Sequence, residues 1–391
     1  MLNTDDLLTA SAAIATVALI LTAVQLLPTT FVRPLLPPEG AGILQPRLAA
    51  IDGLRAFLAL AVVFLHAWAF RDTYFEGKPF DLPRYPFFCE SGLVAVLVFF
   101  MITGFLFWNK AVVARGRVNP FLLYRNRARR ILPLYYFLCC CTVAVVFLRS
   151  SGKIGEPIGI LLREIAGLIV PGLRTAGPLL GSERKVMLAQ SWTLYFEDLF
   201  YLALPILGLA ARSRRTSLTL VLSSLLLLMM KRVEFHRYDY FSLSFLVGIG
   251  VAELLICLPN VRAPLSRKPF GLLILLLPLL VPWLTRGTVT PLVFICAAVS
   301  FVGVAAGNDL FGLLKLRCVR IVGTLSYSIY LLHMLILYCG LTFLNRLTPI
   351  KHLAPFDFSM VVCVAGIIVV AISIFSYRYI EKPWMQVRDR L

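Results

Sequence analysis

Two ionisable residues lie within one long apolar stretch near the start of the chain. Residues 52–66 read Asp-Gly-Leu-Arg-Ala-Phe-Leu-Ala-Leu-Ala-Val-Val-Phe-Leu-His, so that His66 follows Arg55 by eleven positions. Eleven residues of α-helix rise about 16 Å, roughly half the apolar thickness of a bilayer. Ionisable side chains inside a membrane helix are costly and usually serve a function. The spacing predicts that Arg55 and His66 hold the two ends of one long ligand.

Two further residues, Glu197 and His333, are predicted to lie at the depth of His66. From the expected helix starts, His66 is about 22 Å and His333 about 21 Å above the inner face. Glu197 lies about 8 Å below the outer face of a core about 30 Å thick. Two imidazoles and a carboxylate at one level suffice for general acid–base chemistry, with the carboxylate orienting a histidine. The alternative is that such a histidine only hydrogen-bonds between helices.

An arginine pair, Arg127 and Arg130, stands where a basic segment meets an apolar run. Residues three apart share one face of a helix. Guanidinium groups are suited to bidentate phosphate binding, which makes the pair a candidate anion site. The competing interpretation is that cationic residues there only mark the cytoplasmic side of the membrane. Position alone favours this second interpretation.

The composition requires that these residues be positioned by membrane helices. The chain has 391 residues, of which 59% are hydrophobic and 15% charged, and apolar runs recur from residue 7 to residue 380. This predicts an all-α, polytopic membrane helix bundle. The formal charge of +18 resides in short loops between apolar runs, which favours membrane topology and anionic lipid over nucleic acid. The nine cysteines show no CxxC or Cys/His spacing, so neither a disulfide framework nor a metal site is expected.

We expect about eleven transmembrane helices. They are residues 7–27, 51–71, 91–110, 130–149, 192–211, 216–230, 239–257, 269–285, 288–307, 319–345 and 358–380. Residues 1–50 form an extra N-terminal helix and a cytoplasmic linker, and residues 51–391 form the main transmembrane domain. The basic segment 110–130 is expected to face the cytoplasm, which places the N-terminus outside and the C-terminus inside.

Six segments, taken together and in order, resemble the acyltransferase 3 family of integral membrane acyltransferases. They are Ile51-Asp-Gly-Leu-Arg-Ala…His66, Phe99-Phe-Met-Ile-Thr-Gly-Phe-Leu106, Tyr124-Arg-Asn-Arg-Ala-Arg-Arg-Ile-Leu-Pro133, Ser191-Trp-Thr-Leu…Glu197…Phe200-Tyr201, Gly323-Thr-Leu-Ser-Tyr-Ser-Ile-Tyr-Leu-Leu-His333 and Ser376-Tyr-Arg-Tyr-Ile-Glu-Lys-Pro383. Thr103 and Thr193 stand where serine is commoner in the family, and the helix at 7–27 is additional to its ten-helix core.

The resemblance implies that His66 is the catalytic histidine and that Arg55, Arg127 and Arg130 bind the phosphates of coenzyme A. It implies an acyl-coenzyme A donor, commonly acetyl-coenzyme A, on the cytoplasmic side and a glycan acceptor on the other. On the basis of this resemblance, we interpret Arg127 and Arg130 as functional residues. From their predicted depth we expect Glu197 and His333 to complete the catalytic group around His66, with Glu197 either orienting the imidazole or binding acceptor hydroxyls.

The expected function is transfer of an acyl group, most simply acetyl, to a hydroxyl of a surface polysaccharide, lipopolysaccharide or oligosaccharide. The expected location is a bacterial inner membrane, and the expected partners are acyl-coenzyme A, the glycan and membrane lipids. Direct transfer and an acyl-histidine intermediate both remain open. The alternative function is a glycan or lipid flippase or transporter without transferase chemistry. Such proteins often carry an internal repeat, and none is found here.

Overall fold

The computed structural model describes residues 4–32, 35–36, 45–149, 157–171, 186–213, 216, 237–285 and 290–386. Across these ranges every regular element is a helix, which confirms the all-α prediction. The longer helices are α1 (Thr4–Leu26), α3 (Gln45–Asp72), α4 (Pro86–Val113), α5 (Pro120–Arg149), α8 (Trp192–Leu207), α10 (Arg237–Cys257), α12 (Lys268–Thr285), α13 (Pro291–Ala306), α15 (Ser326–Leu347) and α16 (Pro355–Ser376). Shorter ones include α6 (Ile158–Ala166), α14 (Arg317–Thr324) and α17 (Lys382–Met385).

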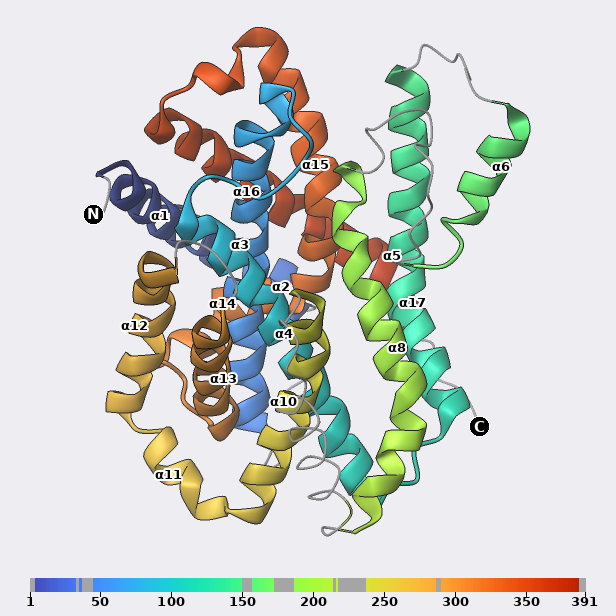
Figure 1. Cartoon of the computed structure of the whole chain (residues 1–391), viewed down its shortest axis with the longest axis vertical. Helices are drawn as coiled ribbons and strands as arrows, with labels where there is room; N and C mark the ends of the chain where they lie inside the picture. The colour runs from blue at the N-terminus through green and yellow to red at the C-terminus, as the bar shows by residue number, and fades with distance from the viewer. Residues whose placement is uncertain are drawn as a thin grey trace.

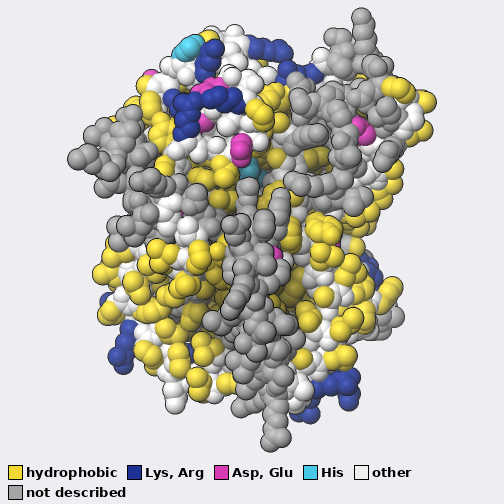
Figure 2. Space-filling model, in the orientation of Figure 1, with side chains coloured by type: hydrophobic (Ala, Val, Ile, Leu, Met, Phe, Trp, Pro, Cys, Tyr) yellow, Lys and Arg dark blue, Asp and Glu magenta, His cyan; other side chains and the backbone are white. Residues whose placement is uncertain are grey.

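Within the described residues, eight helical segments are long and apolar enough to cross a membrane, and two shorter apolar helices, α12 and α13, accompany them. The predicted span 216–230 lies almost entirely outside the described residues, so the predicted count of eleven is not confirmed. Large apolar side chains such as Leu26, Ile206 and Phe343 are exposed on the outside. Figure 2 shows hydrophobic side chains across the middle of the molecule and Lys and Arg side chains gathered at both ends. This distribution is that of an integral membrane protein.

Helix α3 occupies the centre of the bundle and packs against α4, α14 and α15. Figure 1 shows α12 and α13 on one side of this centre, with α5 and α8 on the other. Helix α1 packs against α14 and α16. Because α3 carries both Arg55 and His66, its central position places the two residues among side chains from several other helices.

Glycines bring α4 and α10 to backbone contact. A Cβ atom at Gly104 would overlap the carbonyl oxygen of Phe245, and one at Gly248 would overlap the carbonyl oxygen of Met101. Membrane helices approach closely where small residues replace bulky ones at the interface. This contact fixes α4, which carries Thr103 toward the candidate site.

A second glycine contact positions the first turns of α3. A Cβ atom at Gly323 of α14 would overlap the carbonyl oxygen of Asp52, and Gly53 faces the backbone of Leu314 in the same way. Arg55 follows Asp52 by three residues on the same helix. The close approach of α14 therefore helps to fix where the Arg55 guanidinium lies.

Several predicted helix boundaries differ from the structure, and two of the differences bear on the candidate site residues. Helix α5 begins at Pro120 instead of residue 130, so that Arg127 and Arg130 lie inside the helix. The side chain of Asn119 accepts a hydrogen bond from the Leu122 backbone N–H at 3.1 Å. This N-cap, followed by proline at the first helical position, is a strong helix start.

The predicted span 319–345 is divided at Leu325 into α14 and α15. Helix α14 is amphipathic: Val319 and Val322 are fully buried, whereas the Arg320 side chain is only half-buried. Such a helix is stable at a polar boundary, where its basic side chains remain hydrated. The depth estimated for His333, which assumed one straight helix from residue 319, therefore rested on a wrong boundary.

Candidate functional site

His66 and His333 are in direct contact. Nε2 of His333 lies 3.1 Å from Nδ1 of His66, and the two ring centroids are 4.9 Å apart. His66 projects from the C-terminal part of α3 and is half-buried, while His333 projects from α15 and is fully buried. The structure thus brings together two of the three residues predicted to share one level in the membrane.

The backbone carbonyls around the pair determine which nitrogens carry hydrogen when both rings are neutral. Nδ1 of His333 lies 3.1 Å from the carbonyl oxygen of Ile329, so it donates and leaves Nε2 as the acceptor. Nδ1 of His66 faces two acceptors, the Val62 carbonyl oxygen at 2.9 Å and Nε2 of His333, so it carries the hydrogen. The unprotonated nitrogen of His66 is then Nε2. This arrangement gives His66 the form of a general base, oriented by His333.

Glu197 lies in a pocket instead of beside the imidazole of His66. Its carboxylate oxygens accept long hydrogen bonds from the hydroxyls of Thr103, at 3.4 Å, and Tyr201, at 3.5 Å. This differs from the predicted arrangement, in which Glu197 orients His66. The reason lies in the helix faces, since α3 directs His66 toward α15 whereas α8 directs Glu197 toward α4 and its own Tyr201. Within the described contacts, the residue that orients His66 is His333.

The pocket is open to solvent on one side and spans about 470 Å³, part of which is solvent space at its mouth. Polar and aromatic residues from several helices line it, and the full lining is Arg55, Val96, Phe99, Phe100, Thr193, Leu194, Glu197, Ser326, Tyr327 and Tyr330. The Tyr330 hydroxyl lies 2.9 Å from the Thr193 hydroxyl, and its ring centroid lies 5.9 Å from that of His333. Tyr330 therefore stands between the pocket and the histidine pair.

The three arginines predicted to bind phosphate come from α3 and α5 and lie around Glu197. Arg55 lines the pocket, and its nearest carboxylate is Asp52 at 4.0 Å. The guanidinium groups of Arg55, Arg127 and Arg130 all lie close enough to Glu197, which also lines the pocket, to interact with its charge. The structure therefore assembles a cluster of three cations around one half-buried carboxylate.

Aromatic and sulfur contacts, more than ion pairs, hold the two α5 arginines. The Arg127 guanidinium lies 4.9 Å from the Phe107 ring centroid and 5.6 Å from that of Tyr201. Arg130 donates to the Met385 sulfur at 3.0 Å, and its guanidinium lies 5.8 Å from the Tyr327 ring. Cation–π contacts orient a guanidinium, and a thioether is a weak acceptor. These contacts leave both arginines able to bind an incoming anion.

A further carboxylate, Glu381, was not singled out by sequence reasoning. It is fully buried in a π-helical turn, Tyr377–Glu381, between α16 and α17. One of its oxygens accepts a hydrogen bond from the Ser328 hydroxyl, and the other has no hydrogen-bond partner among the described residues. Its charge interacts with those of Arg130 and Arg55. The sequence signal that could have indicated Glu381 is a carboxylate directly after the last apolar run. In the structure this residue ends a π-helical turn, and such turns are frequent at functional sites.

Comparison with known proteins identifies the family of the chain. Residues 48–378 match an acyltransferase domain, the family model Acyl_transf_3, and α1 precedes the matched region. The chain is 26% identical over 382 residues to the "Putative peptidoglycan O-acetyltransferase YrhL" of Bacillus subtilis (strain 168), an alignment covering 86% of this chain and 54% of the relative. It is 34% identical over 110 residues to the "Exopolysaccharide production protein ExoZ" of Rhizobium meliloti (strain 1021), covering 28% of this chain and 32% of the relative.

The chain thus spans about half the length of the first relative. No solved structure matches it significantly. The family match, in contrast, extends over most of the sequence and includes α3, α5, α8 and α15, the helices that carry the histidine pair and the arginine cluster. The chain belongs to the acyltransferase 3 family.

Proposed function

We propose that this protein is an O-acyltransferase that moves an acyl group, most simply acetyl, from acyl-coenzyme A to a hydroxyl of a cell-envelope glycan. The family supports the transferase activity, and the relatives' names, one a peptidoglycan O-acetyltransferase and one an exopolysaccharide production protein, support the acceptor class. The observation that carries the proposal is that α3 presents Arg55 to a cationic pocket and His66 to a second histidine.

In this proposal the arginine cluster binds the donor. Arg55, Arg127 and Arg130 bind the phosphates of coenzyme A, with charge-assisted and bidentate hydrogen bonds. The pantetheine arm extends through the pocket past Tyr330 toward His66. The rise of α3 between Arg55 and His66, about 16 Å, suits an extended arm of this kind.

His66 acts as the base in the transfer step. Its Nε2 takes the proton of the acceptor hydroxyl as the oxygen attacks the thioester carbonyl carbon. The carbon–sulfur bond then breaks, and the departing thiolate takes the proton from His66, which yields an O-acyl ester and free coenzyme A. His333 accepts a hydrogen bond from Nδ1 of His66 and stabilises the imidazolium that forms in between. A route through an acyl-histidine uses the same residues in two steps.

The proposal includes the sidedness of the two substrates. The N-terminus lies outside and the C-terminus inside a bacterial inner membrane, with the basic segment between α4 and α5 in the cytoplasm. Donor and acceptor then approach from opposite faces. In oriented vesicles, acetyl-coenzyme A should be used only from the side that carries residues 114–119. Acylation that requires donor and acceptor on the same face would exclude the through-membrane arrangement.

The decisive test of the function is release of coenzyme A thiol by the purified protein in detergent. We expect acetyl-coenzyme A to yield free thiol, with label from the acetyl group appearing on glycan as an alkali-labile ester. A protein that moves glycan across vesicles but releases no thiol would be a flippase, and that result would overturn the proposal.

A further inference from the structure

The segment that joins α3 to α4, residues 73–85, passes beside His66. We call it the 73–85 strap. The Phe80 ring is nearly parallel to the His66 imidazole, with an interplanar angle of 5° and 6.2 Å between centroids. Phe80 also contacts Phe70, at 5.2 Å between ring centroids. The strap thus places an aromatic ring beside the imidazole that carries the candidate base.

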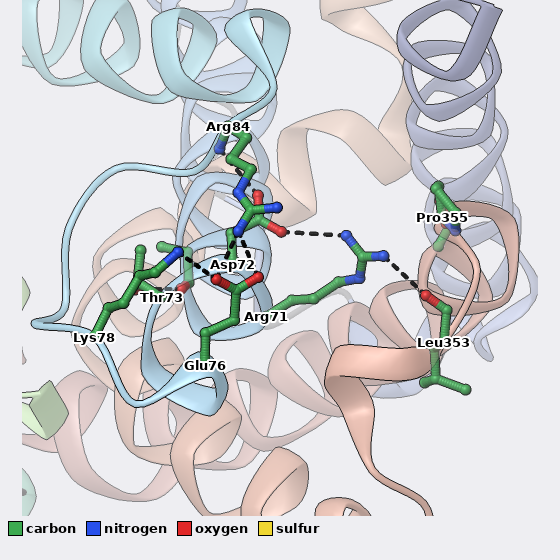
Figure 3. Close-up of polar contacts among 10 residues, drawn as sticks. Arg71, Asp72, Thr73, Glu76, Lys78, Arg84, Leu353 and Pro355 are labelled. Carbon is green, nitrogen blue, oxygen red and sulfur yellow. Dashed lines mark hydrogen bonds and ion pairs between the residues drawn. The ribbon is translucent and has the colours of Figure 1, made fainter.

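Polar contacts pin the ends of the strap. Figure 3 shows the network, in which an Asp72 oxygen accepts the backbone N–H of Arg84 at 2.9 Å. Glu76 pairs with the Arg84 side chain at 2.6 Å. Arg71 joins Asp72, at 3.2 Å, to the carbonyl oxygen of Leu353, at 2.8 Å. Single surface ion pairs stabilise little, but a network that ties both ends to α3 and to the α15–α16 connection fixes where the strap lies.

The side chains of Phe80 and Asp81, near the centre of the strap, take no part in this ion-pair network. Phe80 is half-buried, and Asp81 is exposed with the Leu82 backbone N–H as its described side-chain partner at 2.8 Å. The ion pairs instead use Glu76, Lys78 and Arg84. The strap therefore holds the Phe80 ring beside His66 and places the exposed carboxylate of Asp81 at the next position in the chain, outside the ion-pair network.

We infer that the 73–85 strap is the acceptor subsite, an inference that rests on the proposed transferase function. A sugar ring has C–H groups on its faces and hydroxyls around its rim. The electron-rich face of Phe80 packs against the C–H face, and the Asp81 carboxylate accepts a rim hydroxyl. Packing on Phe80 then directs a neighbouring hydroxyl toward Nε2 of His66. Phe80 and Asp81 thus position the acceptor and select which hydroxyl is acylated.

The competing role for Phe80 is that of an apolar plug that keeps water from His66. A matched pair of variants separates the two roles. Phe80→Ala removes the ring beside His66. Phe75→Ala removes a ring of the same strap that packs against Phe70 and Tyr74 and has no described contact with His66.

The assay uses labelled acetyl-coenzyme A with lysozyme-released peptidoglycan fragments or exopolysaccharide fragments, and wild-type protein is measured first. Phe80→Ala should raise the acceptor KM about tenfold, the upper range for one aromatic contact, with the acetyl-coenzyme A KM unchanged. Phe80→Trp should retain acceptor binding, and Asp81→Asn should raise the acceptor KM less than Phe80→Ala does. Phe75→Ala should keep the wild-type acceptor KM.

Three results would overturn the inference. One is an unchanged acceptor KM in Phe80→Ala, including the case in which only thioester hydrolysis rises, as expected of a plug. Another is an equal rise in Phe75→Ala, which would assign the effect to the folding of the strap. The last is the absence of thiol release by wild-type protein, which would remove the proposed function itself and is distinguishable because it needs no variant.

Discussion

The two ends of the candidate site are built from opposite chemistry. At and near the pocket, three guanidinium groups and two carboxylates, the half-buried Glu197 and the buried Glu381, are held by aromatic rings, hydroxyls and a thioether. The described hydrogen-bond partners of His66 are another imidazole and one backbone carbonyl oxygen. Charge is concentrated where a polyanionic donor would be bound, and none of the described hydrogen-bond partners of His66 is charged. A neutral imidazole among neutral partners remains a base, whereas a cation cluster beside it would disfavour the imidazolium.

Removal of the proposed base, His66, tests the difference between the two ends of the site most directly. His66→Ala should lower kcat by about 10²- to 10⁴-fold, the contribution of a positioned general base. The side chain is half-buried, so the variant should fold. Activity is measured as acetyl label on glycan, and folding as monodispersity in detergent. Substantial turnover by well-folded His66→Ala would remove this residue from the mechanism.

The proposed donor-binding end of the site is tested by substitution of its arginines. Arg127→Ala or Arg130→Ala removes a charge-assisted contact of about 1.5–3 kcal/mol, so the acyl-coenzyme A KM should rise about ten- to a hundredfold. The acceptor KM should change little. Arg117→Ala is the matched control, since this exposed arginine belongs to the α4–α5 connection outside the pocket. Equal donor KM values in all three variants would leave the pair with a role in topology alone.

A smaller effect is expected from the partner histidine. His333→Ala removes one hydrogen bond to His66, which should lower kcat about tenfold without changing either KM. His333→Gln keeps an acceptor oxygen near Nδ1 of His66 and should restore part of the rate. The pH dependence of kcat should also move in His333→Ala, because the environment of the base changes. Loss of activity with equal loss in both variants and an unmoved pH profile would indicate a packing role.

The smallest effect concerns Glu381. Glu381→Gln removes a negative charge that competes for the arginines and retains the side-chain volume. The acyl-coenzyme A KM should therefore fall by about two- to fivefold, because Glu381 acts on Arg130 and Arg55 through charge without a direct ion pair among the described residues. Glu253→Gln is the control, because it changes a buried carboxylate that accepts a hydrogen bond from the Trp108 indole N–H. It measures the effect of replacing any buried carboxylate. A rise in the donor KM specific to Glu381→Gln would assign this carboxylate a supporting role instead of a competing one.

Local sequence was sufficient to predict that the described elements are helices, but not where each helix ends. Apolar segments in a membrane form helices because their backbone groups must be paired internally. The ends depend on local features: Asn119 and Pro120 begin α5 before the apolar run does, and the helix is interrupted at Leu325 between α14 and α15. Such features extend over only a few residues, so hydropathy alone does not reveal them.

The sequence alone determined the separation of Arg55 and His66, because both lie on one helix whose rise per residue is constant. It likewise determined the membrane character of the chain and the family resemblance. Only the tertiary structure decided that His66 meets His333, 267 positions away, while Glu197 joins the arginines. Depth along a membrane is set by residue count, but the partner of a side chain depends on how each helix is rotated and tilted. Contacts such as those of Gly104 and Gly323 with facing backbone set that rotation and tilt.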